Sequence, residues 1–137
     1  MKPAMPYLNF NGNCREAMQF YATHLRGELN ITEFQPGMCQ APDMEGRVMH
    51  ANIVSNGMPV LMASDTMVDK PCTFGDNFWV ALMPDSRDHL QQLCAGLSEG
   101  GTVQMQPQDM FWGDYFGMLT DRFGVNWMLN FPNPKSA

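Results

Sequence analysis

Apolar and polar residues alternate along two stretches of the chain, and a short turn-forming sequence interrupts each stretch. Residues 48–54 and 60–64 flank the sequence Ser-Asn-Gly at residues 55–57. Two further apolar runs within residues 116–131 flank Asp-Arg-Phe-Gly at residues 121–124. In the second turn an acidic residue opens the turn, and a glycine can take the positive φ that closes it. The alternation therefore predicts two β-hairpins.

The pattern also predicts one amphipathic helix before each hairpin. Asn13 opens a capping-box pattern at the start of the first helix, and the second helix is predicted to start at Asp85 or Ser86. Gly27 and the glycine pair at residues 100–101 are predicted to end the two helices. The apolar residues at helical spacing are Ala17, Phe20, Tyr21 and Leu25 in the first helix and Leu90, Leu93, Cys94 and Leu97 in the second.

Both halves of the chain repeat the same order of elements. Each half begins with a predicted strand, passes into its helix, and then adds a strand, a connecting loop and a hairpin. The strands outside the hairpins are predicted at residues 7–10, 29–34, 78–83 and 103–105. Each half is therefore β-α-β-β-β. We expect two modules, at about residues 5–66 and 76–132, within a single α+β domain that spans residues 1–137.

Composition excludes several classes of protein. The 137 residues are 45% hydrophobic and 16% charged, which is typical of a globular domain, and no apolar run is long enough to span a bilayer. The first six residues lack the apolar core of a signal peptide, so we expect a cytoplasmic protein without a membrane partner. The four cysteines are widely spaced and are interpreted as free thiols. A net charge of −6 with scattered basic residues argues against a nucleic-acid partner.

Three segments together resemble the PhnB-like branch of the glyoxalase/bleomycin-resistance/dioxygenase superfamily. They are PYLNFNGNCREAMQFY at residues 6–21, MHANIVSNGMPVLMASD at 49–65 and WGDYFGMLTDRFGVNWMLNF at 112–131. The resemblance implies a vicinal-oxygen-chelate fold, in which two modules form a curled mixed sheet around a cavity. It also implies a homodimer with a small-molecule ligand. Some members of this branch carry names that imply ubiquinone methyl transfer, but this chain has no glycine-rich loop after a strand, and we expect no cofactor.

The resemblance further implies a divalent metal, which enzymes of this superfamily hold with His, Gln or Glu on the first and last strands of each half. Here the matching positions are occupied by Met128, Phe78, Met62 and, on the first strand, by Pro6, Tyr7 or Asn9. A shift of one residue along the other three strands gives no typical ligand of a hard metal either, and a thioether is a soft ligand suited to Cu(I). We therefore expect the usual metal site to be missing.

His50 is the best candidate for chemistry. Alternation within residues 49–53 places it on the same strand face as Asn52. If that face lines the cavity, the two residues offer a general base and hydrogen-bonding groups to a ligand. The alternative is a buried histidine that bonds to a neighbouring strand or to a dimer partner.

The second candidate region is the predicted loop at residues 108–115. Its aromatic residues Phe111 and Trp112 would stack on a flat or apolar ligand, and Asp114 would orient a polar group. The alternative is that these aromatics seal a sheet edge or a dimer interface. Tyr115 is a candidate proton donor to a leaving group, or else a core hydroxyl bonded to a main-chain carbonyl.

Two further groups of residues have a structural and a functional interpretation. Several of the fourteen methionines fall in or near predicted strands, where they either line a cavity for apolar ligands or fill the core. These are Met62, Met83, Met105, Met118 and Met128. Asp65, Asp85 and Asp121 sit at strand ends or turns, where aspartate caps a helix or closes a turn.

Three functions are consistent with these observations. The favoured one is a small-molecule-binding protein without the usual divalent metal site, with Asn52, Met62, Phe78, Phe111, Trp112, Asp114 and Met128 as ligand contacts and His50 and Tyr115 as catalytic candidates. The second is a metal-dependent lyase, isomerase or dioxygenase of the same superfamily. The third is a non-catalytic dimer that sequesters a drug or metabolite.

Overall fold

The computed structural model describes residues 1–37 and 42–133, and Cys39 lies outside them. The chain divides into two compact units, Met1–Thr73 and Phe74–Ala137. In the described residues, no helix has the length and apolar character needed to cross a membrane.

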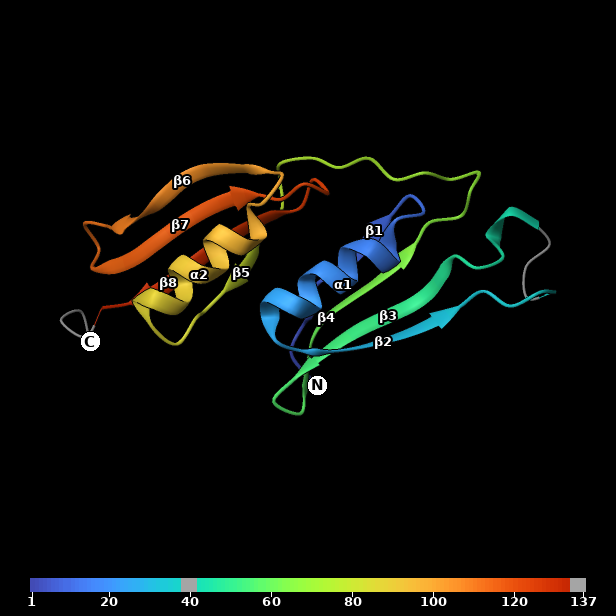
Figure 1. Cartoon of the computed structure of the whole chain (residues 1–137), viewed down its shortest axis with the longest axis horizontal. Coiled ribbons are helices and arrows are strands. Elements are labelled where there is room, and N and C mark those ends of the chain that lie inside the picture. The colour runs from blue at the N-terminus through green and yellow to red at the C-terminus, as the bar shows by residue number, and fades with distance from the viewer. Residues whose placement is uncertain (38–41, 134–137) are drawn as a thin grey trace. The chain divides into compact units, whose positions relative to one another are not determined.

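The first unit contains one helix and one mixed four-stranded sheet (Figure 1). Its elements are β1 (Tyr7–Phe10), α1 (Cys14–Leu25), β2 (Glu28–Glu33), the 3₁₀ helix η1 (Pro42–Met44), β3 (Val48–Ser55) and β4 (Met58–Asp65). The strand order is β1-β4-β3-β2, with β1 parallel to β4 and the other pairs antiparallel.

The second unit repeats this arrangement. Its elements are β5 (Val80–Leu82), α2 (Arg87–Leu97), β6 (Thr102–Asp109), β7 (Asp114–Thr120) and β8 (Asn126–Pro132). The strand order is β5-β8-β7-β6, and again only the first pair, β5 and β8, is parallel. The predicted α+β class and the repeated β-α-β-β-β order are confirmed.

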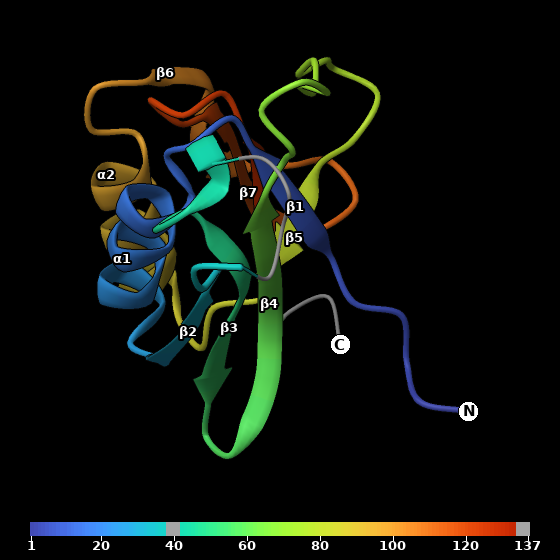
Figure 2. The ribbon, with the colours of Figure 1, turned by 90° about the vertical axis from the view of Figure 1, so that its right-hand side faces the viewer.

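Each helix covers one face of the sheet in its own unit, as Figure 2 shows for α1. The buried side chains lie between helix and sheet because strand residues alternate between the two faces. They include Phe10, Met18, Tyr21, Ile53 and Leu61 in the first unit and Leu90, Leu97, Leu119, Trp127 and Leu129 in the second. The sheet face turned away from the unit's own helix is called the open face below.

The first helix begins at the predicted place but is capped by a different residue. Asn13 occupies the N-cap position, and its side chain makes no capping hydrogen bond. Instead the Asp65 carboxylate at the end of β4 accepts bonds from the backbone N–H groups of Gly12 and Cys14, at 2.9 and 3.0 Å. The predicted capping box at Asn13 is therefore wrong, because a carboxylate distant in sequence takes its role.

The end of the first helix also differs from the prediction. Arg26, not Gly27, adopts the left-handed conformation, with φ of 53°. Glycine is needed at position 27 because the backbone there passes close to a side chain of β3. A Cβ atom on Gly27 would lie 2.4 Å from Ile53 Cγ2. The second helix starts as predicted, because Ser86 is its N-cap and accepts a bond from the His89 N–H at 3.0 Å. It ends at Leu97, before the glycine pair at residues 100–101.

Half of the predicted loop at residues 108–115 is strand. β6 extends to Asp109, and β7 begins at Asp114, so only a tight turn separates them. The Met110 N–H donates to the Asp114 carbonyl at 2.8 Å and closes this turn. Pro107 is accommodated within β6 because β6 is an edge strand, where a missing N–H removes no ladder bond. Phe78 lies before β5, which is shorter than predicted.

A second buried carboxylate organises the hairpin of β7 and β8. Asp121 Oδ1 accepts bonds from the N–H groups of Phe123 and Val125, at 2.8 and 3.1 Å. Its Oδ2 accepts the indole N–H of the buried Trp127 at 2.8 Å. The structural interpretation of Asp65 and Asp121 is thereby confirmed.

Removing the Asp65 carboxylate is expected to destabilise the protein. Asp65→Ala leaves three backbone N–H groups without their acceptor, those of Gly12, Cys14 and Val48. We expect the free energy of unfolding to fall by about 3 kcal/mol, since hydrogen bonds to charged groups are strong and buried orphan donors are costly. Urea unfolding measures this change. Asp85→Ala is the control, because that side chain is 97% exposed, and a loss of equal size there would contradict the prediction.

Candidate functional site

The open face of the first unit carries a row of four side chains, one from each strand. Tyr7 on β1 is the register partner of Met62 on β4, and Met62 is the partner of Asn52 on β3. Asn52 in turn pairs with Asn30 on β2, whose amide donates to Asn52 Oδ1 at 3.0 Å. The row therefore crosses the whole sheet.

His50 lies two residues from Asn52 on the same strand and shares this open face. The Tyr7 hydroxyl is 3.2 Å from His50 Nδ1, and the two ring centroids are 5.8 Å apart. When the hydroxyl donates to Nδ1, the ring proton resides on Nε2, which is then available as a donor. Tyr7 is 44% exposed and His50 is half-buried, so both rings are accessible.

The middle of this face is polar but uncharged. Its groups are two amides, an imidazole, a phenol and a thioether, and the Ser64 hydroxyl adds a long bond to Asn9 Oδ1 at 3.5 Å. The amides, the imidazole, the phenol and the hydroxyl both donate and accept hydrogen bonds, whereas the thioether is only a weak acceptor. The face is therefore suited to a ligand with several uncharged hydrogen-bonding groups.

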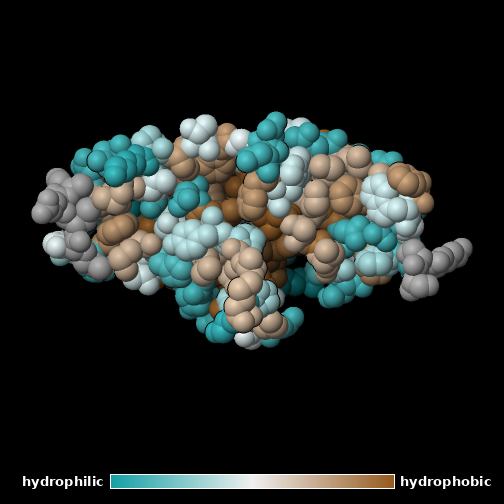
Figure 3. Space-filling view, turned by 180° about the vertical axis from the view of Figure 1, so that it is seen from behind, coloured by the Kyte–Doolittle hydropathy of each residue, from teal (hydrophilic) through white to brown (hydrophobic). Residues whose placement is uncertain are grey.

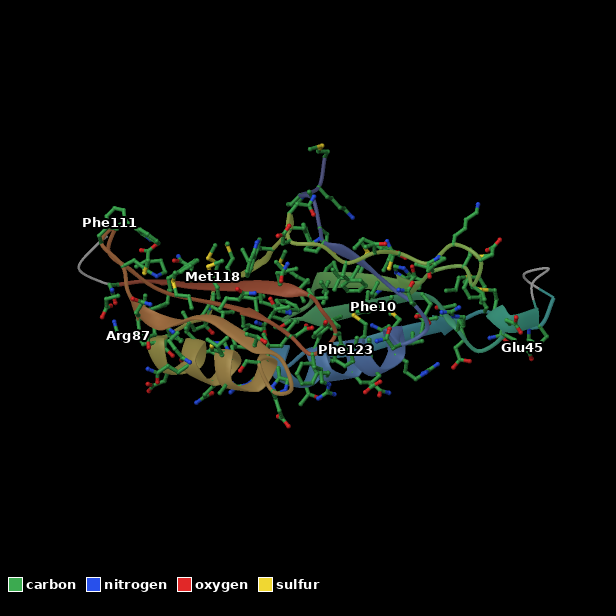
Figure 4. The ribbon with its side chains drawn as sticks, turned by 90° about the horizontal axis from the view of Figure 1, so that it is seen from above. Phe10, Glu45, Arg87, Phe111, Met118 and Phe123 are labelled. Atoms are coloured by element: carbon green, nitrogen blue, oxygen red, sulfur yellow. The ribbon has the colours of Figure 1, made fainter. Side chains whose placement is uncertain are left out.

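The open face of the second unit is of a different kind. The rings of Trp112 and Phe116 meet edge to face at 5.9 Å, and Phe111 meets Trp112 in the same way at 5.0 Å. Phe111 is 96% exposed at the tip of the β6–β7 turn, and Trp112 is 47% exposed (Figure 4). Figure 3 views the molecule from behind, where brown apolar residues lie at the surface among teal polar ones.

Tyr115 lies on the opposite face of β7, toward α2. Its hydroxyl accepts a bond from the Gln91 amide at 2.8 Å, and the Arg87 guanidinium stacks 4.0 Å above its ring centroid. A groove of about 420 Å³ adjoins it between α2 and β6. The groove is lined by Gln91, Cys94, Ala95, Ser98, Val103, Gln106, Pro107 and Tyr115.

A hydrogen-bonded network holds the β6–β7 turn against α2 and the end of β8. Arg87 makes two bonds to the Asp109 carboxylate, at 2.7 and 3.2 Å. The Asn133 amide donates to Asp109 at 2.9 Å and to the Gly113 carbonyl at 2.8 Å. The bonds from Arg87, and then that from Asn133, hold the pKa of the Asp109 carboxyl below its usual value. The same pairing raises the pKa of Arg87.

The positions implied for a divalent metal do not fit a hard ion. On the open faces, the outer parallel pairs present Tyr7 with Met62, and Ala81 with Met128. These residues offer a phenol, two thioethers and a methyl group, whereas hard divalent ions prefer carboxylate or imidazole ligands. Ala81, not Phe78, is the register partner of Met128. Among residues 1–37 and 42–133, no three His, Cys, Asp or Glu side chains are grouped so as to hold a metal.

The structure brings some of the predicted site residues together. His50, Asn52 and Met62 share the open face of the first unit, and Trp112 and Met128 belong to the second unit, with Asp114 half-buried at the start of β7. Tyr115 faces α2, and Phe78 precedes its strand, so neither joins a row on an open face. From the sequence, Tyr7 is predicted only as one of the residues at an implied metal-ligand position. Alternation in the first strand, which puts Tyr7 and Asn9 opposite the buried Leu8 and Phe10, is the signal that points to it.

Residues 2–130 match a protein-family model described as 3-demethylubiquinone-9 3-methyltransferase. Protein PA1353 from Pseudomonas aeruginosa is 41% identical, and its crystal structure has a TM-score of 0.83 with 96% of this chain and 98% of that chain covered. A PhnB protein from Bacillus cereus is 26% identical with a TM-score of 0.78, and 95% and 99% of the two chains are covered.

A glyoxalase/bleomycin resistance protein/dioxygenase family enzyme from Burkholderia phytofirmans PsJN has the same fold at 14% identity. Its TM-score is 0.64, with 96% of this chain and 100% of that chain covered. The vicinal-oxygen-chelate fold that the sequence led us to expect is therefore confirmed.

The network around Asp109 generates a prediction for its titration. We expect the pKa of Asp109 to rise toward its usual value in Arg87→Gln, because the strongest bond to the charged form is lost. The depressed pKa means that the carboxylate supports the fold above its usual pKa, and that this support is lost as the pH falls through the folded-state value. Carboxyl ¹³C NMR measures the titration. Arg122→Gln is the control, and an unchanged Asp109 titration in Arg87→Gln would contradict the assignment.

Proposed function

The chain belongs to the PhnB-like family described as 3-demethylubiquinone-9 3-methyltransferase, and we propose that it binds a small organic molecule on the open face of its first unit. The observation that carries this proposal is the row of Tyr7, Met62, Asn52 and Asn30, with His50 beside it. Hydrogen-bonding groups that gather on a sheet face away from the helix, and remain accessible, are suited to a ligand.

In this proposal His50 is the central polar group. The Tyr7 contact orients its ring, and Nε2 donates a hydrogen bond to the ligand or, in the other tautomer, accepts a proton as a general base. Asn52 supplies an amide beside it. We leave Tyr115 out of the site, because its hydroxyl accepts a bond from Gln91 on the α2 side of its sheet.

The second unit, taken by itself, presents a surface suited to an apolar or aromatic group. Phe111, Trp112 and Met128 are proposed as contacts in that unit, together with Asp114 as a polar neighbour. A preformed aromatic pair at a tight turn offers a rigid stacking surface, and the Arg87–Asp109 pair holds the strand ends beside that turn. Phe78 is half exposed and remains a proposed contact.

We propose binding and not methyl transfer. The family description names a methyltransferase, but the sequence has no glycine-rich cofactor loop between a strand and a helix. We also propose that no hard divalent metal takes part, since thioethers and a phenol occupy the implied positions. The homodimer and the cytoplasmic location expected from the sequence stay predictions.

Ligand binding is tested by soaking crystals of the full chain in a mixed metabolite library. We expect density for a bound molecule against the open face of the first unit, with a polar atom near His50. The affinity of the compound identified should fall about fivefold in His50→Ala and in Asn52→Ala, since each loses about one hydrogen bond worth ~1 kcal/mol. His24→Ala on α1 is the matched control. Density only elsewhere, or equal affinity in all three variants, would refute the proposed site.

The metal part of the proposal is tested separately. Protein purified without a chelator is analysed for zinc, nickel, iron and manganese by elemental analysis. We expect less than a tenth of an equivalent of each metal. One equivalent of any of them, lost on His50→Ala, would overturn this part and support a metal-dependent enzyme instead.

A further inference from the structure

Three methionines lie side by side on adjacent strands of the second unit. Met118 on β7 is the register partner of Met128 on β8 and also of Met105 on β6. All three side chains are half-buried, so each sulfur is sheltered and still within reach of solvent. Thioethers from three neighbouring strands therefore lie within one small area of the sheet.

The three side chains share the open face. Cross-strand partners in an antiparallel pair point to the same side of the sheet. Figure 4 shows Met118 on the side of the sheet away from α2, with sulfur-bearing side chains near it. The groove on the α2 side is lined by Val103, Gln106 and Pro107, but not by Met105. The ladder is irregular on either side of Met105, which allows its neighbours to face α2 while Met105 pairs with Met118.

The geometry allows the three sulfurs to converge. Neighbouring strands are ~4.8 Å apart, so the outer two methionines are separated by roughly 10 Å across Met118. Each unbranched side chain has three rotatable bonds and adapts to the space around it. Met105 and Met128 can therefore both lean toward the central Met118 from opposite sides.

We propose that Met105, Met118 and Met128 form a binding site for a soft monovalent cation, Cu(I). Thioethers are neutral soft ligands that select Cu(I) over hard divalent ions, and they bind without releasing a proton. The chain's net charge of −6 favours a cation over an anion at such a site. The ion would sit beside Met128, where the superfamily's hard-metal ligand is replaced by sulfur.

The cysteines are the competing ligands that a test must separate. Burial, and then the neighbouring Asp65 charge, raises the pKa of the Cys14 thiol to about 12. Burial also raises the pKa of the Cys94 thiol, so both remain protonated near neutral pH. Cys72 is half-buried, and Cys39 lies outside the described residues. The full chain carrying Cys39→Ser and Cys72→Ser is therefore the appropriate background.

The test is a Cu(I) titration of this background protein in competition with a chromophoric Cu(I) chelator. We expect one equivalent to bind, with the ε-methyl ¹³C resonances of the three methionines shifting together and no shift on addition of Zn(II). Met118→Leu should weaken binding at least tenfold, because the two remaining thioethers are not adjacent. Met105→Leu on the edge strand should weaken it as well.

The control is Met58→Leu at the start of β4, where the methionine is 66% exposed and belongs to the other unit. It should bind Cu(I) as the parent protein does. Circular dichroism melts confirm that every variant is folded, and leucine preserves the volume at each position. Absence of Cu(I) binding would overturn the proposal, as would undiminished binding by folded Met118→Leu or shifts confined to other methionines.

Discussion

The carboxylate of Asp65 is the interaction on which the first unit depends. Its two oxygens join the last residue of β4 to the corner before α1 and to the first residue of β3, through the N–H groups of Gly12, Cys14 and Val48. A buried carboxylate is tolerable only when it accepts several such bonds. It therefore ties the start of α1 to the sheet that the helix covers. The face that α1 leaves uncovered is the one that carries the candidate site.

The two units repeat one architecture but differ in surface chemistry. Both place a helix on one face of a mixed sheet with the same strand order. In the first unit the open face presents amides, an imidazole and a phenol. In the second it presents thioethers and aromatic rings. Since the apolar side of each strand is used against the helix, the open side is free to differ, and the two units carry open faces of different chemistry.

Local patterns in the sequence were sufficient for the hairpins and for both helix starts, because alternation and turn residues depend on neighbours a few positions away. The errors came from long-range contacts. Asn13 was predicted to cap the first helix with its side chain, but the carboxylate of Asp65 accepts the hydrogen bonds there. Gly27 was predicted to end that helix, but glycine is required at this position because a Cβ atom would lie too close to Ile53. The end of β6 was missed because pairing with β7 extends it beyond its own apolar run. For the candidate site, alternation along the strand was enough to place His50 and Asn52 on one face. The residues beside them on the neighbouring strands could be identified only from the strand register in the structure.

The strand register also determines which side chains lie beside Met128 in the second unit. From the sequence, Phe78 and Met128 were each placed at an implied metal position, where the usual hard ligands are missing and a thioether is a soft ligand. In the sheet Ala81 faces Met128, and Met118 and Met105 continue the row. Ala81 contributes only a methyl group, so the outer parallel pair offers little to any ion. The other two sulfur atoms belong to β7 and β6, on the side of β8 where neighbouring strands are antiparallel. A soft ion there would thus be held in part by β6 and β7, which do not carry the superfamily's usual ligands. Met118 on β7, with no counterpart among those ligand positions, is therefore the residue on which such a site depends.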